Sequence, residues 1–126
     1  MKKRPNILIC GGAGYIGGYV TDLLSEKEYD VTVYDSLIYE HRYLKKVPFI
    51  FGDIRDKTKL KKLLPTFDVV IWLAALVGDP ACALQPSLSS EINFKATEWL
   101  AKHYKGRIIF TSTCSVYGIN NDLIDE

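Results

Sequence analysis

The segment Gly11-Gly12-Ala13-Gly14-Tyr15-Ile16-Gly17 constrains the fold of this chain more than any other. It stands between a short apolar run, residues 6–10, and an amphipathic stretch from Tyr15 to about Lys27, which predict a buried strand and a helix. Glycines at such a junction permit unusual backbone angles, close approach of a ligand to the backbone, and tight packing of helix on strand. The first turn of the helix then offers free N–H groups to a phosphate.

Apolar runs and helical spacing predict the rest of the fold. Four more apolar runs predict strands, at residues 31–34, 48–51, 69–73 and 107–111. Helical spacing predicts two more helices, over 56–64 and about 87–104, with Asp56 as an N-cap and Gly106 as a C-terminal cap. Residues 36–46 and 78–80 are predicted as loops. Alternating helices and apolar strands indicate an α/β fold, a doubly wound parallel (Rossmann) sheet of about five strands with helices on both faces.

Composition excludes several classes of protein. The 126 residues fit one domain, and a formal net charge of +1 gives no electrostatic reason to expect a nucleic acid or an anionic membrane as partner. Apolar runs stay far below the ~20 residues of a membrane span. Three widely spaced cysteines suggest buried, reduced thiols rather than a disulfide framework or zinc site. We therefore expect a cytoplasmic protein without a bound metal.

Asp35 closes the second predicted strand, 18 residues after Gly17. This spacing is close to the ~20 residues expected of an acid that binds the ribose hydroxyls of a dinucleotide. A carboxylate here accepts hydrogen bonds from a 2′-hydroxyl and repels a 2′-phosphate, so NAD is expected rather than NADP, although His41 and Arg42 could offset that preference. A plain turn with a solvated aspartate, or a methyltransferase of similar layout, fits these features less well.

Four later segments resemble one family. Gly52-Asp53-Ile54-Arg55-Asp56 follows the third predicted strand, Trp72-Leu73-Ala74-Ala75 ends the fourth, Asn93 lies in the last helix, and residues 110–118 read Phe-Thr-Ser-Thr-Cys-Ser-Val-Tyr-Gly. They are similar to motifs of the extended short-chain dehydrogenase/reductases, in particular the NAD-dependent epimerases and dehydratases of nucleotide sugars. Trp72 replaces a frequent histidine of that family, and Ala96 replaces a glycine.

The resemblance implies a role for each matching residue. It makes Thr113 the catalytic hydroxyl that hydrogen-bonds the substrate oxygen undergoing oxidation. It also implies that NAD contacts thirteen positions: Gly11, Gly14, Tyr15, Ile16, Gly17, Asp35, Ser36, Asp53, Ile54, Leu73, Ala74, Ala75 and Asn93. Because asparagine is a poor helix former, Asn93 within the last helix predicts a tertiary contact, and a solvated or structural role is as compatible with the sequence as a direct contact with NAD. A nucleotide sugar is the implied substrate, and the last predicted helix is the implied homodimer interface.

The family's catalytic Tyr-x-x-x-Lys pair is missing, because none of the eight tyrosines has a lysine four residues later. Lysine in that pair lowers the pKa of the tyrosine so that it can act as a base. We therefore expect residues 1–126 to be an incomplete NAD-binding domain of a longer enzyme, without the C-terminal part of the fold and the substrate domain, and inactive alone. The alternative is a small non-catalytic NAD-binding or redox-sensing module. Isolated from the rest of an enzyme, the chain should oligomerise or be only marginally soluble, because its last helix would leave apolar surface bare.

Overall fold

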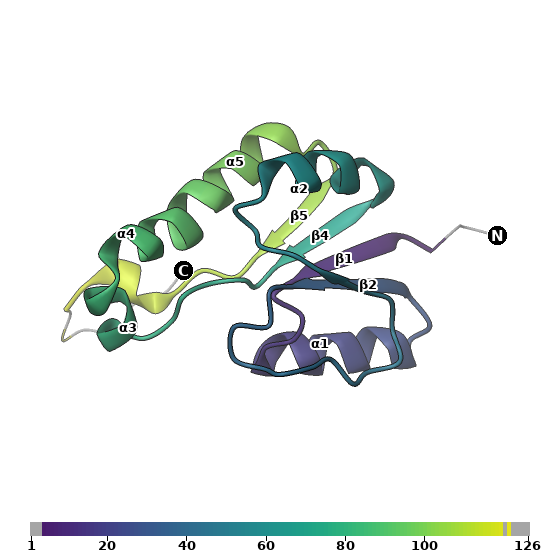
Figure 1. Ribbon diagram of the computed structural model, residues 1–126, viewed down its shortest axis with the longest axis horizontal. Coiled ribbons are helices and arrows are strands. Elements are labelled where there is room, and N and C mark those ends of the chain that lie inside the picture. Colours follow the sequence, from purple (N-terminus) through teal and green to yellow (C-terminus); the bar gives the residue numbers. More distant parts are fainter. Residues whose placement is uncertain (1–3, 120, 122–126) are drawn as a thin grey trace.

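The computed structural model describes residues 4–119 and 121, and these form a parallel sheet with helices on both faces (Figure 1). The five strands are β1 (Asn6–Cys10), β2 (Asp30–Asp35), β3 (Phe49–Phe51), β4 (Val69–Trp72) and β5 (Arg107–Phe110). Their order across the sheet is β3-β2-β1-β4-β5, so the chain reverses its direction of winding between β3 and β4. The predicted doubly wound Rossmann fold is therefore confirmed, with strand ends displaced by one residue at most.

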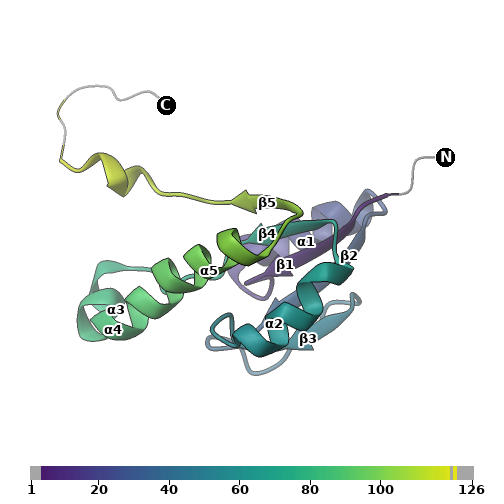
Figure 2. The same cartoon turned by 90° about the horizontal axis from the view of Figure 1, so that it is seen from above.

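Helix α1 (Tyr15–Glu26) covers one face of the sheet (Figures 1 and 2). Gly17 and Thr21 are its buried residues, and Val20 and Leu24 pack against the core of β1, β2 and β4. The spacing of apolar residues predicts that Ile16 and Leu23 face the sheet. This prediction is wrong, because both side chains are exposed. Ile16 is 61% exposed, because the two small buried residues bring the helix backbone, rather than long side chains, close to the sheet.

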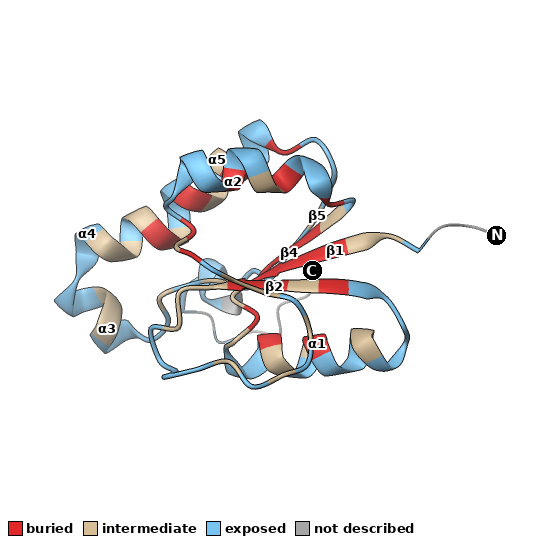
Figure 3. Ribbon diagram, turned by 45° about the vertical axis from the view of Figure 1, so that its right-hand side comes forward, coloured by how far each residue is buried: buried red, intermediate tan, exposed pale blue. Residues whose placement is uncertain are grey.

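Helices α2 (Lys57–Leu63) and α5 (Ala96–His103) cover the opposite face, side by side. Asp56 caps α2 as predicted, since its carboxylate accepts a hydrogen bond from the Lys59 N–H at 2.9 Å. The larger of the two cores lies beneath these helices, and Tyr34 and Trp72 are its largest fully buried side chains. Figure 3 shows the buried positions on the strands and on the inner sides of the helices.

The long helix predicted over 87–104 consists of three segments. They are α4 (Pro86–Ser89), the π-helical turn η2 (Ser90–Lys95), and α5. A further short helix, α3 (Asp79–Leu84), begins within the predicted loop 78–80 and continues beyond it, with Pro80 in its first turn. The expected cap at Gly106 is also wrong, because α5 ends at His103 and Tyr104 already has extended backbone. Two 3-10 turns, η1 (Leu64–Thr66) and η3 (Cys114–Tyr117), complete the elements of the described residues.

Candidate functional site

The turn after β1 requires glycine at its first position. Gly11 has a φ of +84°, in the region that favours glycine, and its N–H donates to the Tyr34 carbonyl at 2.9 Å. A Cβ atom on Gly11 would lie only 2.5 Å from the Ala74 nitrogen. The loop between β1 and α1 therefore lies directly against the backbone that follows β4.

Gly17 brings the start of α1 onto this turn. A Cβ atom there would overlap the Gly11 carbonyl oxygen and the Gly12 backbone. The neighbouring Gly18 has room for one, since its nearest contact would be the Lys45 side chain at 3.4 Å. Close packing of helix on loop, one of the roles expected of these glycines, is thus confirmed at Gly17. Gly14 is the N-cap of α1, and the Tyr15 side chain after it is 97% exposed.

Asp35 joins this loop to the chain that follows β2. One carboxylate oxygen accepts from the Ala13 N–H at 3.0 Å, and the other accepts from the Leu37 N–H at 2.8 Å. Ser36 lies between Asp35 and Leu37 in the sequence, and Leu37 has a φ of +53°. The sequence places Asp35 near a ribose but does not predict its bond to the glycine loop. Both oxygens keep further lone pairs, so the carboxylate can still accept from a ligand.

Asp53 and Ile54 follow β3 and are held from two sides. The Tyr34 hydroxyl donates to the Asp53 carbonyl at 2.7 Å, and the Ile54 side chain is buried. The Arg55 side chain donates to the Asp53 carboxylate, with Nη2 at 2.5 Å, and its N–H adds a bond at 2.8 Å. These hydrogen bonds from Arg55 lower the pKa of Asp53. Because the Ile54 side chain is in the core, only the backbone of this residue is open to a ligand.

Leu73, Ala74 and Ala75 continue β4 beyond the sheet. The Leu73 N–H still donates to the Cys10 carbonyl at 2.8 Å, after which Ala74 meets Gly11 and Ala75 is exposed. Small side chains here keep the surface beside the glycine loop open.

The cysteines differ in burial. Cys10 is buried, and burial raises the pKa of its thiol. Cys82 is only partly buried, and the Cys114 side chain lies outside the described residues.

The side chain of Asn93 binds the backbone of Leu76, the residue that follows Ala75. Its amide oxygen accepts from the Leu76 N–H at 2.8 Å, and its amide nitrogen donates to the Leu76 carbonyl at 2.8 Å. The same nitrogen also contacts the Ser89 hydroxyl at 3.3 Å. Asn93 lies in the π-helical turn, a feature that often marks functional positions. Its contact is thus with the backbone beside the candidate site, which confirms the tertiary contact expected of a mid-helix asparagine.

Thr113 follows β5 and begins η3. Its hydroxyl oxygen accepts from the Ser115 N–H at 3.2 Å, which leaves the hydroxyl proton free to donate elsewhere. The residue is exposed. The described contacts do not join Thr113 to the glycine loop, so its participation in the same site stays a prediction.

All these residues lie at one edge of the sheet. The glycine loop, Asp35, Asp53, Ala74 and Thr113 each follow the carboxyl end of a strand, and the strands are parallel. Open α/β sheets bind ligands at this edge, where the strand order reverses. In this sheet the reversal falls between β1 and β4, at the contact of Gly11 with Ala74.

A sequence model of the NAD dependent epimerase/dehydratase family matches residues 7–126. The chain belongs to this family. Similar proteins include a UDP-N-acetyl-alpha-D-glucosaminuronate decarboxylase from Bacillus cytotoxicus, 34% identical over 94% of this chain and 39% of that protein. A UDP-glucose 4-epimerase from Halalkalibacterium halodurans is 40% identical over 89% of this chain and 36% of its own length. This member of the family therefore spans about two fifths of the length of the curated relatives it matches.

Solved structures agree with this assignment. The UDP-glucose 4-epimerase of Brucella ovis, crystallised in complex with NAD, superposes with a TM-score of 0.84 at 30% identity. The match covers 94% of this chain and 38% of that enzyme. An L-threonine 3-dehydrogenase from Trypanosoma brucei is also similar, with a TM-score of 0.76 and 25% identity. Proteins that resemble this chain thus differ in their substrates.

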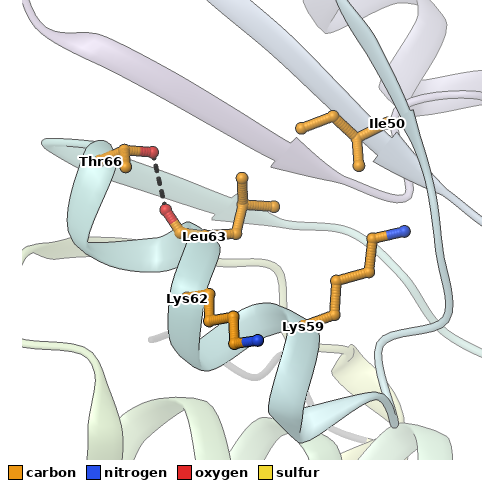
Figure 4. A pocket seen from close by; sticks show the side chains of 5 residues that line it. All are labelled: Ile50, Lys59, Lys62, Leu63 and Thr66. Atoms are coloured by element: carbon orange, nitrogen blue, oxygen red, sulfur yellow. Dashed lines mark hydrogen bonds between the residues drawn. The ribbon is translucent and has the colours of Figure 1, made fainter.

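The described residues add two further observations. Within residues 4–119 and 121, no helix has both the length and the apolar character needed to cross a membrane, and no cluster of three or more metal-binding side chains occurs. A hollow of about 270 Å³ lies between α2 and β3 (Figure 4). Its lining is Ile50, Lys59, Lys62, Leu63 and Thr66, which includes none of the predicted site residues.

Proposed function

We propose that this chain is the NAD-binding part of an oxidoreductase that acts on a nucleotide sugar. The observation that carries the proposal is the junction of Gly11 with Ala74, beside the Asp35 carboxylate. There Gly11 carries no side chain and Ala74 only a methyl group, which suits close approach of a pyrophosphate. Tyr15 and Ile16 lie exposed at the start of α1, where helix N–H groups attract phosphate.

The choice of NAD over NADP rests on Asp35. Its carboxylate is held in place by two backbone N–H groups and retains lone pairs for a ribose hydroxyl. A 2′-phosphate at the same position would face this negative charge at close range. NAD, when bound, supplies a hydride acceptor. In the longer enzyme the Thr113 hydroxyl would then donate a hydrogen bond to the sugar oxygen.

Proton removal is the step that this chain is not expected to perform. The Tyr-x-x-x-Lys pair of the family does not occur in its sequence, and burial raises the pKa of Tyr34, Tyr43 and Tyr104 instead of lowering it. We therefore expect residues 1–126 to bind NAD and not to oxidise a sugar. We also propose that the longer protein is a homodimer joined through the helix from α4 to α5.

Calorimetric titration of the chain with NAD and with NADP tests the proposal. NAD should bind in a saturable way, and NADP at least about tenfold more weakly, a factor that corresponds to about 1.4 kcal/mol. Asp35→Asn should reduce this ratio because it removes the charge. Gly18→Ala is the matched control, since its added methyl group has room and lies outside the candidate site.

Two results would contradict this assignment. One is the absence of a saturable signal with either dinucleotide, although circular dichroism shows a folded chain. The other is an NAD to NADP ratio that Asp35→Asn leaves unchanged. Formation of NADH by the isolated chain from a nucleotide sugar would contradict the expected inactivity alone.

A further inference from the structure

A second hollow, of about 310 Å³, lies between the ends of α2 and α5, and we name it the α2–α5 cleft. Its size is at the lower end of the range for small-molecule sites. The cleft is apolar and aromatic at its base and basic at its rim. Its lining residues are Lys61, Leu64, Pro65, Phe67, Trp99, His103, Tyr104, Lys105 and Gly106.

Aromatic rings give the cleft a fixed shape. The Trp99 and His103 rings stack with centroids 4.6 Å apart and planes 16° apart, and His103 Nδ1 lies 2.8 Å from the Trp99 carbonyl oxygen. Tyr104 is buried, and its hydroxyl donates to the Phe67 carbonyl at 2.9 Å. A Cβ on Gly106 would overlap the Tyr104 ring, so glycine is needed there to admit this ring. The cleft is thus a built feature of the fold.

The residues that line the α2–α5 cleft include lysines but no acid. Asp68, which follows the lining residue Phe67, lies close by, and burial with a contribution from the charge of Asp68 raises the pKa of Tyr104. Residues 57–66 contain four lysines and residues 99–110 contain two lysines and one arginine, and neither stretch contains an acid. Among the described residues that line the cleft, none is acidic, and the lysines in ion pairs are others: Lys45, Lys95 and Lys102. Lys61 and Lys105 therefore present amines without a carboxylate partner in the described part of the chain.

The cleft is remote from the candidate cofactor site. Phe67 precedes β4 and Ala74 follows it, so the two sites lie at opposite edges of the sheet. A strand rises about 3.3 Å per residue, which puts about 20 Å between them. A ligand in the α2–α5 cleft would thus not compete with one at the glycine loop.

We propose that the α2–α5 cleft binds a small anion that carries a planar ring. The stacked rings of Trp99, which is partly buried, and His103, which is exposed, offer aromatic surface to the ring, and ring stacking favours planar ligands. Lys61 and Lys105 offer their amines to a phosphate or carboxylate group on that ring, as charge-assisted hydrogen bonds. The volume of the cleft favours such a ligand over an extended acidic peptide.

Phenyl phosphate is a suitable probe, with inorganic phosphate and benzyl alcohol as the charge-only and ring-only comparisons. Binding is followed through the indole N–H signals of the two tryptophans by NMR, because Trp99 lines the cleft while the buried Trp72 serves as an internal reference. Phenyl phosphate should shift the Trp99 signal in a saturable way and bind more tightly than either comparison.

Variants make the test specific. Lys61→Gln and Lys105→Gln should each weaken binding by about tenfold, since each removes one charged donor. Lys46→Gln, an exposed change on the segment before β3, and Asp35→Asn, at the cofactor edge, should leave the affinity unchanged.

Three results would overturn the proposal. The first is a Trp99 signal that does not saturate with phenyl phosphate. The second is inorganic phosphate that binds as tightly as phenyl phosphate. The third is an affinity for phenyl phosphate that is the same in both lysine variants as in the wild type. Tighter binding of a peptide rich in Asp and Glu than of phenyl phosphate would also overturn it, in favour of a protein partner. Since Asp35→Asn affects NAD alone, failure here leaves the proposed function untouched.

Discussion

The side chain of Tyr34 determines which residue can follow β3. Its ring occupies the space that a Cβ on Gly52 would need, and its hydroxyl donates to the Asp53 carbonyl at 2.7 Å. Lys59 lies 5.9 Å from the centre of the same ring. A tyrosine of β2 thus fixes the Gly-Asp motif that follows the neighbouring strand, and with it Asp53, which the family resemblance predicts to contact NAD.

Tyr34→Phe should destabilise the protein and flatten its alkaline pH dependence. Burial, with a contribution from the charge of Asp56, raises the pKa of the Tyr34 hydroxyl. The resulting stability is fully present below the unfolded pKa of about 10 and is lost as the pH rises through it toward the folded pKa. The variant should lose about 1 kcal/mol near neutral pH, because the hydrogen bond is gone. Urea denaturation near pH 7.5 and near pH 10.5 measures both effects, the ~3-unit interval bracketing the unfolded pKa.

The exposed Tyr39 supplies the control for this comparison. Tyr39→Phe should change neither the stability near neutral pH nor its fall at high pH. An alkaline loss of stability that is as large in Tyr34→Phe as in the wild type would show that other groups cause it.

The roles of individual residues differ in how far the sequence alone can predict them. Gly11 and Gly17 are predictable, because a strand–loop–helix pattern leaves few reasons for glycine at that spacing. The bond from the Ala13 N–H to Asp35 is not, because it joins residues 22 positions apart through a loop whose course depends on the whole sheet. Sequence alone therefore places the acid at the correct edge of the sheet without its partners.

At the scale of the element, the helical segment from α4 to α5 shows what side-chain spacing leaves out. Helical spacing predicts an inner stripe of five residues, Leu88, Ile92, Ala96, Trp99 and Leu100. Ile92, Ala96 and Leu100 are buried as this pattern predicts, while Leu88 and Trp99 pack against the core and are only partly buried. The π-helical turn among them is invisible to this pattern, since it shows in backbone bonds such as that from the Ala96 N–H to the Glu91 carbonyl. Helix α3 cannot be predicted from side-chain spacing, because its six residues expose much of their surface and give no apolar stripe.

Asn93→Ala should loosen the segment after β4 and leave the helix in place. The amide of Asn93 satisfies both backbone groups of Leu76, and each lost bond of this kind costs about 1 kcal/mol. Hydrogen exchange of the Leu76 amide should therefore become about tenfold faster or more. Ser89→Ala, which removes only the 3.3 Å contact to Asn93, should leave that exchange nearly unchanged. Wild-type protection of Leu76 in Asn93→Ala would mean that the loop holds its conformation without the amide.

At the scale of the whole molecule, the sheet separates two edges with different characters. The carboxyl edge has glycines, small residues and acids, which suit the dinucleotide proposed there. The opposite edge, near the C-terminal ends of α2 and α5, has the lysines and aromatic rings of the α2–α5 cleft. The near-neutral net charge of the chain conceals this separation, because composition averages over both edges.

The outer surface of the molecule carries apolar side chains that the described residues leave uncovered. Phe94, on the helical segment between α4 and α5, is 62% exposed, and Phe110 is half exposed on β5, the last strand of the sheet. Exposed apolar surface of this kind marks contact sites in soluble proteins. We therefore expect the isolated chain to associate with itself as its concentration rises, chiefly through the helix that bears Phe94.

Sedimentation velocity over a range of concentrations measures this association and locates it. Phe94→Ser should weaken it by about tenfold or more, because burial of a phenylalanine side chain contributes roughly 1.5–3 kcal/mol. Tyr19→Ser, a change at an exposed aromatic residue of α1 across the sheet, is the control and should have no effect. A wild-type chain that stays monomeric at high concentration would rule out the helical interface. Association that survives Phe94→Ser but is lost in Phe110→Ser would place the contact on the edge strand β5 instead, because an unpaired strand edge is itself a site of pairing between chains.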